Sequence, residues 1–329
     1  MIETIYLERD VRDHFRSRQI IERFPDARVI ECERYGEIFN RKAQDFRAQK
    51  LRPSLILAGK AGRFVLPAPA GYGVGGARHY YFSHMLNCLY DCRYCFLQGM
   101  YRSAHYVLFV NFEAFAEEIA LTSNESDAET WFFSGYDCDS LALEPVTGFV
   151  SFMLERFPEH SKTFLELRTK STQIRPLLGV APRSNWVVAF SLSPDSVARA
   201  LEHKAPSLVR RVAAMRRLQQ AGWSVGLRID PMVMYDGWES DYREFARWVF
   251  AQLDGSNLHS VSLGGFRAPK SFFEKMVRLY PAESLFAGPL VDNDGVIGYP
   301  SPMARQMSEF MIGELAGYVA RERVFVCND

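Results

Sequence analysis

The sequence has no excess of charge of either sign, and this absence bounds the classes of partner. Lys and Arg number 39, as do Asp and Glu, so the formal net charge is zero and the isoelectric point is near 7.1. The strongly basic balance that is typical of many nucleic-acid-binding proteins is therefore missing. Any contact with nucleic acid would need a local basic face, which composition does not reveal.

Long hydrophobic runs are also absent, although 48% of the residues are hydrophobic and can form a large core. No stretch approaches the roughly 18 consecutive apolar residues that a membrane-spanning helix requires. The first 15 residues, MIETIYLERDVRDHF, are charged and lack the apolar centre of a signal peptide. The sequence thus predicts a soluble cytoplasmic protein without a membrane partner.

Cysteine is scarce and unevenly placed. The six cysteines are Cys32, Cys88, Cys92, Cys95, Cys138 and Cys327. Three fall on one short loop and the others are scattered, which is not the pattern of a disulfide framework. This distribution favours a reducing compartment.

The three clustered cysteines form a C-x3-C-x2-C loop, and they are the strongest chemical signal in the chain. Three thiolates on so short a loop can converge on one metal centre and leave a coordination position open for chemistry. The alternatives are a zinc site completed by His84 or His79, or three buried thiols without a metal. Zinc motifs usually consist of two separated ligand pairs, and the sequence has no second pair.

From residue 79 onward, short apolar strands alternate with amphipathic helices, which predicts a parallel sheet with crossover helices. The predicted strands are 79–83, 130–136, 163–169, 186–191, 224–229 and 258–263. The predicted helices are 112–122, 145–155, 207–221 and 242–253, with a further short helix between the third and fourth strands. Six such units suit a partial (β/α)6 barrel of the TIM type, although periodicity alone would equally allow an open doubly wound sheet.

The remaining segments flank this unit. Residues 1–78 are expected to form an N-terminal helical extension that ends in a linker, 67–78, rich in Gly, Pro and Ala. This linker lacks the Gly-Lys-Ser/Thr of a phosphate-binding loop. Residues 79–270 are expected to form the barrel. Within 271–329 we expect a β-hairpin around Asp294-Gly295, because Asp-Gly between β-prone flanks favours a tight turn, and a closing helix over 303–320.

The cysteine loop, with Tyr94 before its last cysteine, resembles the signature of the radical S-adenosylmethionine enzymes. The resemblance implies that Cys88, Cys92 and Cys95 hold a [4Fe–4S] cluster whose fourth iron binds S-adenosylmethionine. It also implies a partial (β/α)6 barrel, an external electron donor of the flavodoxin or ferredoxin type, and a contact between Tyr94 and the adenine of the cofactor.

In such a barrel, ligands gather at the carboxyl ends of the strands. The resemblance places Ser134 and Gly135 near the methionine amine, Lys170 as a point charge for the cofactor carboxylate, and Ser191 near the ribose or carboxylate. An ordinary loop glycine and an exposed lysine are the alternatives for Gly135 and Lys170. Weaker candidates for substrate contact are Arg228, Asp230 and Arg267.

The chain further resembles the spore photoproduct lyase group over roughly residues 80–325. The likeness rests on the cysteine loop with its Cys95-Phe-Leu-Gln98 extension and on the motifs Val107-x3-Asn111, Asp139-x4-Glu144-x2-Thr147, Phe190-Ser191 and Gly237-Trp238. It implies a lyase that repairs a thymine adduct in damaged DNA through a 5′-deoxyadenosyl radical. The same chemistry on another nucleic acid, a peptide or a metabolite is the alternative, and a non-catalytic metal protein is a more distant one.

In that group, a cysteine on the loop after the second strand returns a hydrogen atom to the product radical, with tyrosines nearby as a relay. Here this loop carries both Tyr136 and Cys138, and the resemblance leaves the donor open between them. The chain also departs from the group at Phe96, where a relay tyrosine is expected, although Tyr94 remains. At these positions the chain differs from the group, and the alternative substrates named above stay open.

Overall fold

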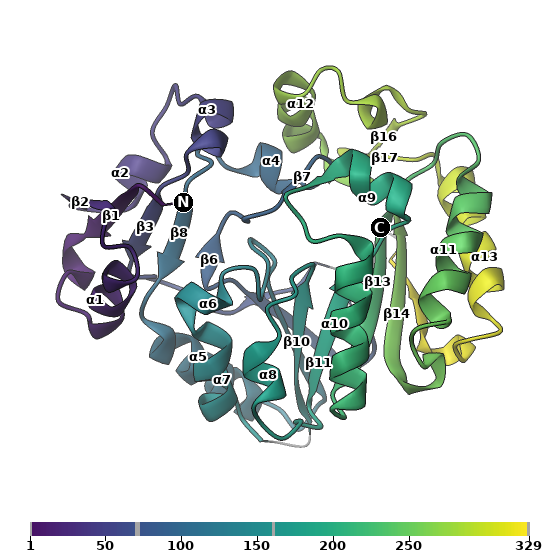
Figure 1. Ribbon diagram of the computed structural model, residues 1–329, viewed down its shortest axis with the longest axis horizontal. Helices are drawn as coiled ribbons and strands as arrows, with labels where there is room; N and C mark the ends of the chain where they lie inside the picture. The colour runs from purple at the N-terminus through teal and green to yellow at the C-terminus, as the bar shows by residue number, and fades with distance from the viewer. Residues whose placement is uncertain (1, 70–72, 160–161, 328–329) are drawn as a thin grey trace.

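The computed structural model describes residues 2–69, 73–159 and 162–327 (Figure 1). Its centre is an eight-stranded sheet in the order β18-β14-β13-β11-β10-β9-β5-β4. Six of these strands follow one another in chain order, and every neighbouring pair among the six is parallel. They are β5 (Arg78–Phe82), β9 (Thr130–Ser134), β10 (Thr163–Thr169), β11 (Trp186–Ser191), β13 (Ser224–Met232) and β14 (Leu258–Gly265). The predicted partial (β/α)6 barrel is confirmed.

Two short strands extend the sheet beyond the six. β4 (Leu66–Pro67) pairs antiparallel with β5 at one edge, and β18 (Val324–Val326) pairs parallel with β14 at the other. The sequence did not predict either strand, because two or three residues are too few to display a period.

Helices cover the outer face of the curled sheet (Figure 1). Their bounds are α5 (Phe112–Asn124), α7 (Phe149–Arg156), α8 (Arg175–Leu178), α10 (Leu208–Gln220) and α11 (Trp238–Phe250), whereas α9 (Asp195–Leu201) lies near the strand ends and contacts β12 (Glu202–His203). In α10 the residues predicted to face the core, Leu208, Val212, Met215 and Leu218, are buried. The helix predicted over 145–155 is divided by Gly148, which has φ of 62° and separates α6 (Glu144–Thr147) from α7.

The N-terminal extension is not purely helical, so that expectation was wrong. It contains α1 (Phe15–Glu22), α2 (Gly36–Phe39) and α3 (Phe46–Leu51), but also most of a second, five-stranded sheet in the order β2-β1-β3-β8-β6. The strands are β1 (Thr4–Glu8), β2 (Arg28–Cys32), β3 (Leu55–Ala58), β8 (Tyr106–Phe109) and β6 (Met85–Leu86). The strands of this sheet are short, and β2 lies at a largely exposed edge. The alternation of apolar and polar residues that marks a strand was therefore too weak to recognise among the surrounding charged residues.

The C-terminal hairpin is confirmed. β16 (Val291–Asn293) and β17 (Val296–Gly298) pair across Asp294-Gly295, which have φ of 50° and 90°, and β15 (Arg267–Pro269) adds a third strand. α12 (Lys270–Leu279) then packs on α4 (Leu97–Met100), the helix that follows the cysteine loop. The contact is so close that a Cβ on Gly99 would lie 2.2 Å from the carbonyl oxygen of Phe272. The closing helix is α13 (Ser301–Leu315).

Across the described residues, no helix combines the length and apolarity needed to cross a membrane. Part of the glycine-rich linker, residues 70–72, lies outside the described residues.

Candidate active site

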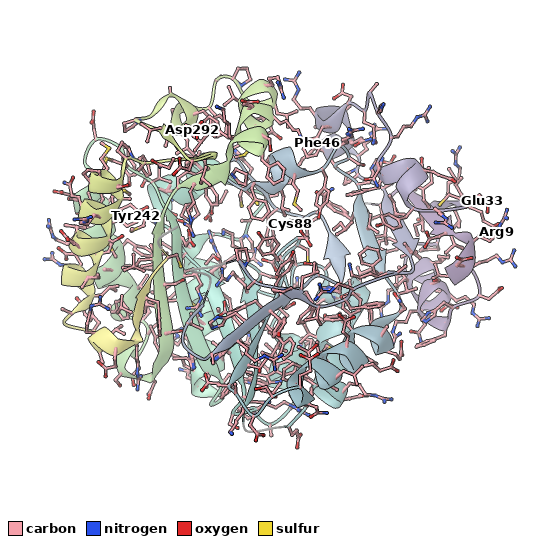
Figure 2. All side chains as sticks on the ribbon, turned by 180° about the vertical axis from the view of Figure 1, so that it is seen from behind. Arg9, Glu33, Phe46, Cys88, Tyr242 and Asp292 are labelled. Carbon is pink, nitrogen blue, oxygen red and sulfur yellow. The ribbon has the colours of Figure 1, made fainter. Side chains whose placement is uncertain are left out.

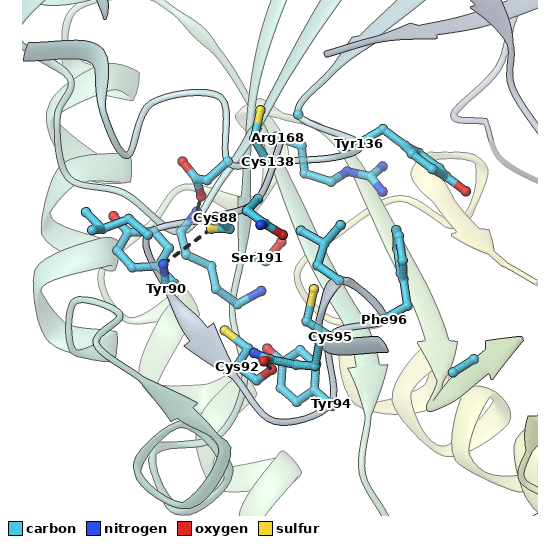
Figure 3. Close-up of a pocket in the computed structure, with 18 of the residues that line it drawn as sticks. Cys88, Tyr90, Cys92, Tyr94, Cys95, Phe96, Tyr136, Cys138, Arg168 and Ser191 are labelled. Carbon is cyan, nitrogen blue, oxygen red and sulfur yellow. Dashed lines mark hydrogen bonds between the residues drawn. The ribbon is translucent and has the colours of Figure 1, made fainter. Parts of the chain in front are cut away.

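A cavity of about 440 Å³ opens at the carboxyl ends of the barrel strands, within the size range of small-molecule sites. Cys88, Cys92 and Cys95 line it together with residues from β9, β10, β11 and β13 or the loops that follow them. Figure 3 shows the three cysteine side chains around this cavity, with Cys138 at the end away from Cys92. Most of the residues predicted from the sequence therefore meet in one place.

The cysteine loop is held from two sides by backbone and side-chain contacts. Its strand β7 (Asp91–Cys92) pairs antiparallel with β12 (Glu202–His203), and the amide of Arg93 donates to the carbonyl of Leu201 at 2.7 Å. The carboxylate of Asp91 accepts from Lys50 at 2.9 Å, from Arg93 at 3.0 Å and from Gln98 at 3.0 Å. Because Lys50 belongs to α3, the N-terminal unit helps to fix the loop.

The arrangement fits a metal cluster better than a zinc ion. His84 is buried, stacks on Phe149 with ring centroids 4.1 Å apart, and has its pKa lowered to about 3 by burial. His79 places Nε2 2.7 Å from the carbonyl oxygen of Gly75, and neither histidine lines the cavity. Within the described chain, no three His, Cys, Asp or Glu side chains are close enough to hold one ion. A cluster is larger than an ion and keeps its ligands further apart, so three free thiols around one cavity suit it.

A buried carboxylate that the sequence did not point to lies beneath the cysteine loop. Glu202 accepts hydrogen bonds from the hydroxyl of Tyr94 and from Arg211, and its Oε1 lies 4.0 Å from Nζ of Lys170. Burial alone would raise the pKa of Glu202, but Lys170 and Arg211 outweigh it and lower that pKa. Lys170 also lies over the ring of Tyr94, 5.4 Å from its centroid. Glu202 thus positions both Tyr94 and Lys170.

A second carboxylate with several partners is Asp139, whose side chain joins the loop after β9 to the end of β10. It accepts from the hydroxyl of Thr169 at 2.7 Å and from the amide of Lys170 at 2.6 Å. The amides of Leu141 and Ala142 also donate to it, at 2.9 and 2.8 Å. Asp139 belongs to a motif shared with the resembled group, and that was the only sequence signal for it.

The small residues at the end of β9 lie in different environments. Gly135 lines the cavity and has φ of 87°, and a Cβ there would lie 2.6 Å from Oγ of Ser140. Only glycine therefore suits this position. Ser134 is buried, and its hydroxyl has no hydrogen-bond partner among the described residues. It is not among the residues that line the cavity.

Tyr136 and Cys138 both line the cavity, but their surroundings differ (Figure 3). The ring of Tyr136 lies between two aromatic rings, with centroid distances of 4.3 Å to Tyr81 and 5.5 Å to Phe96. Cys138 is buried, and burial raises the pKa of its thiol well above the usual value. Cys138 therefore keeps its S–H proton at neutral pH.

Three of the candidates from the later strands line the cavity, namely Ser191, Asp230 and Arg267, and Asp230 forms an ion pair with Arg267 at 3.0 Å.

Arg228 does not line the cavity, so the expectation that it faces the site was wrong. Arg228 is 1% exposed and pairs inside the barrel with Glu166 at 2.6 Å. Glu166 also binds Arg168 at 2.9 Å, and Arg168 does line the cavity. The sequence did not point to Arg168, which is a cation anchored from behind by a buried carboxylate.

We expect Glu166→Gln to destabilise the fold by about 3–5 kcal/mol, because it leaves the buried charge of Arg228 without its partner. Burial alone would raise the pKa of Glu166, but Arg228 and Arg168 hold it at about 2. The stabilisation is therefore complete above the ordinary value near 4.5 and is lost as pH falls toward 2. Urea unfolding should show the largest difference from wild type at neutral pH.

Asp195→Asn is the matched control, because it breaks the exposed Arg199–Asp195 pair and should cost less than about 1 kcal/mol. Equal effects of the two variants would contradict the role assigned to Glu166.

A family model described as spore photoproduct lyase matches residues 77–276. Among curated relatives, the spore photoproduct lyase of Bacillus subtilis is 25% identical over 177 residues, covering 53% of this chain and 52% of the relative. That of Clostridium acetobutylicum is 22% identical over 200 residues, covering 60% and 59%. The sequence matches thus span about half the length of these relatives.

Solved structures resemble the whole fold. A spore photoproduct lyase complexed with dinucleoside spore photoproduct superposes with a TM-score of 0.85 at 18% identity, covering 100% of this chain and 98% of that one. A mutant of a spore photoproduct lyase with bound AdoMet and dinucleoside spore photoproduct matches equally well, with the same TM-score, identity and coverage. The likeness includes the N-terminal extension, which the family model does not cover.

Proposed function

Because this chain belongs to the spore photoproduct lyase family, we propose that it is a radical S-adenosylmethionine lyase that acts on a pyrimidine lesion of DNA. One observation carries the proposal. Three free thiols from one loop, a lysine and an aromatic ring line the same cavity at the carboxyl ends of the barrel strands. This combination suits a cluster that binds and cleaves a charged nucleoside cofactor.

Cys88, Cys92 and Cys95 would hold a [4Fe–4S] cluster, which leaves one iron free of a protein thiolate. When bound, the cluster supplies the electron that cleaves S-adenosylmethionine into methionine and a 5′-deoxyadenosyl radical. The contacts of Asp91 with Lys50, Arg93 and Gln98 keep the loop in place around it.

The residues around the thiols are suited to orient the cofactor. Lys170 offers a positive charge for its carboxylate, and Ser191 a hydroxyl for the ribose or carboxylate. Gly135 lets the backbone approach the methionine amine closely, and Ser134, the last residue of β9, lies next to it in the chain. Tyr94, fixed through its hydroxyl by Glu202, would lie against the adenine.

Hydrogen return is assigned to the loop after β9. Cys138 keeps its proton because its thiol is buried, and a protonated thiol can give a hydrogen atom to a carbon radical. Tyr136 is the second candidate, since it lines the same cavity beside Phe96. Tyr94 is the remaining tyrosine of the cysteine loop and could take part in a relay.

The far end of the cavity supports a nucleic-acid substrate. Aromatic rings at Phe96 and Tyr136 can stack on bases, and Arg168 and Arg267 offer donors for carbonyl or phosphate oxygens. We further propose a cytoplasmic setting, because all six cysteines are free, and an external one-electron carrier of the flavodoxin or ferredoxin type.

Turnover of a synthetic dinucleoside spore photoproduct tests the function. The anaerobically reconstituted protein, supplied with S-adenosylmethionine and a reductant, should convert this lesion to two thymidines. Formation of 5′-deoxyadenosine without loss of the lesion would mean that the same radical chemistry serves another nucleic acid, a peptide or a metabolite. Failure to bind iron would leave only a structural metal or none.

We expect Lys170→Ala to weaken S-adenosylmethionine binding by about 1.5–3 kcal/mol, or about 10- to 100-fold in Kd, because a charge-assisted bond to the carboxylate is lost. The fold should persist, since Glu202 keeps Arg211 as its partner. Calorimetric titration of the reconstituted protein measures the effect, and Lys42→Ala, an exposed lysine, is the control. An unchanged Kd would confine Lys170 to its contact with Glu202.

A further inference from the structure

Helix α10 presents a row of cations that no carboxylate neutralises. From residue 203 to residue 229 the sequence contains no Asp or Glu. Arg210, Arg216 and Arg217 are exposed, and none of them takes part in an ion pair among the described side chains. Val209, on the same outward face, is 62% exposed. We call these four residues the α10 basic face.

This face differs from the two helices that flank α10 in the sequence, α9 and α11. On α9 the exposed Arg199 pairs with Asp195, and on α11 the exposed residues Glu239 and Glu244 accompany Arg247. An ordinary solvated helix carries both signs in this way. A face of one sign, with an apolar residue among its cations, is suited to an acidic partner.

The α10 basic face begins close to the strand that pairs with the cysteine loop. The two-residue strand β12 directly precedes α10, and its residues Glu202 and His203 pair with Cys92 and Asp91. His203, which pairs with Asp91, is exposed, whereas Glu202 beside Cys92 is buried. Arg211 ties the first turns of α10 to this strand through Glu202 and to β11 through the carbonyl of Ser191, at 2.9 Å.

We propose that the α10 basic face, with the adjoining turn of β12, docks an acidic one-electron carrier that reduces the site through Cys92. The inference rests on the proposed function, which requires an electron. One electron would leave the reduced carrier and be gained by the cluster that Cys92 would help to hold, with no bond formed or broken and no proton transferred. The interfaces of such redox complexes bury little surface and form transiently, and opposite charges on the two partners speed their association.

The position of the face favours a carrier over nucleic acid. α10 runs along the outer face of the sheet, away from the strand ends that line the cavity (Figure 1). A phosphate backbone bound along it would lie away from the cavity that must receive the base. An electron carrier, in contrast, only needs to approach Cys92, which the β12 end of the helix permits.

The test uses the reconstituted protein and flavodoxin hydroquinone, mixed anaerobically at low ionic strength. The triple variant R210E/R216E/R217E should lower the second-order rate of flavodoxin oxidation at least about tenfold and remove most of its dependence on salt. R210Q/R216Q/R217Q removes the charges without reversing them, and glutamine forms helices about as well as arginine. This variant should lower the rate by an intermediate amount. The matched control R18E/R63E/R305E changes the net charge equally on other exposed arginines and should change the rate less than about twofold.

Two further measurements separate this inference from the proposed function. Light-driven reduction with deazaflavin needs no protein carrier, so the α10 variants should then form 5′-deoxyadenosine at the wild-type rate. Calorimetric titration with oxidised flavodoxin reports docking even if the protein cleaves no cofactor. Equal losses in the α10 and control triples, no loss in either, or a wild-type protein that flavodoxin neither binds nor reduces would overturn the proposal. So would an α10 triple that loses duplex DNA binding but keeps its rate with flavodoxin.

Discussion

Replacing any one of Cys88, Cys92 and Cys95 by alanine should leave the anaerobically reconstituted protein without its brown colour and without activity. The wild type should carry about four irons per chain. Each thiol lines the cavity from the same loop, so two remaining thiolates would hold a cluster too weakly to survive purification. Iron and sulfide analysis and the yield of 5′-deoxyadenosine measure the loss.

Cys32→Ala and Cys327→Ala are the matched controls, because both thiols are free and neither lines the cavity. They should keep full iron content. One tightly held zinc in the wild type, or iron that persists in all three cavity variants, would refute the assignment of the loop.

The second large effect is expected at the hydrogen donor. If Cys138 returns the hydrogen atom, Cys138→Ala should still cleave the cofactor and consume the lesion, but its product radical should be quenched wrongly. Adducts with the reductant should then replace most of the normal product, because no protonated thiol remains at that end of the cavity. If Tyr136 is the donor, Tyr136→Phe should show this outcome instead. Mass spectrometry of the products distinguishes the two.

Tyr81→Phe provides the comparison, since it keeps the ring that packs on Tyr136 and removes only a hydroxyl outside the cavity lining. It should give normal product. Normal product from Cys138→Ala, from Tyr136→Phe and from the double variant would exclude a donor on this loop.

Local patterns predicted much of this molecule. The spacing of the cysteines placed three thiols on one loop, and the alternation of apolar strands with helices placed Gly135, Lys170 and Ser191 at strand ends. The cysteine loop and each single strand or helix are defined by a few consecutive residues, where chain geometry decides which side chains point the same way. The fold class followed from that alternation together with the cysteine loop.

Contacts between distant segments could not be predicted in this way. Tyr94 and Glu202 lie 108 residues apart, and only the pairing of β7 with β12 brings them together. The same holds for Asp139 and the end of β10, and for Lys50, which reaches Asp91 from the N-terminal unit. Such partners are set by packing and not by spacing.

The sequence by itself determined the chemistry available to this protein, namely three thiols on one loop within a parallel α/β barrel. It also contained the acid-free stretch of α10, because charge is a property of the residues alone. Only the tertiary structure decided which groups surround the thiols. In the folded protein His84 is buried and stacks on Phe149, and Arg228 points into the barrel and pairs with Glu166. Arg168, in contrast, lines the cavity. The physical reason is that burial of a charge depends on a partner, and partners are chosen by the packing of segments that are remote in sequence.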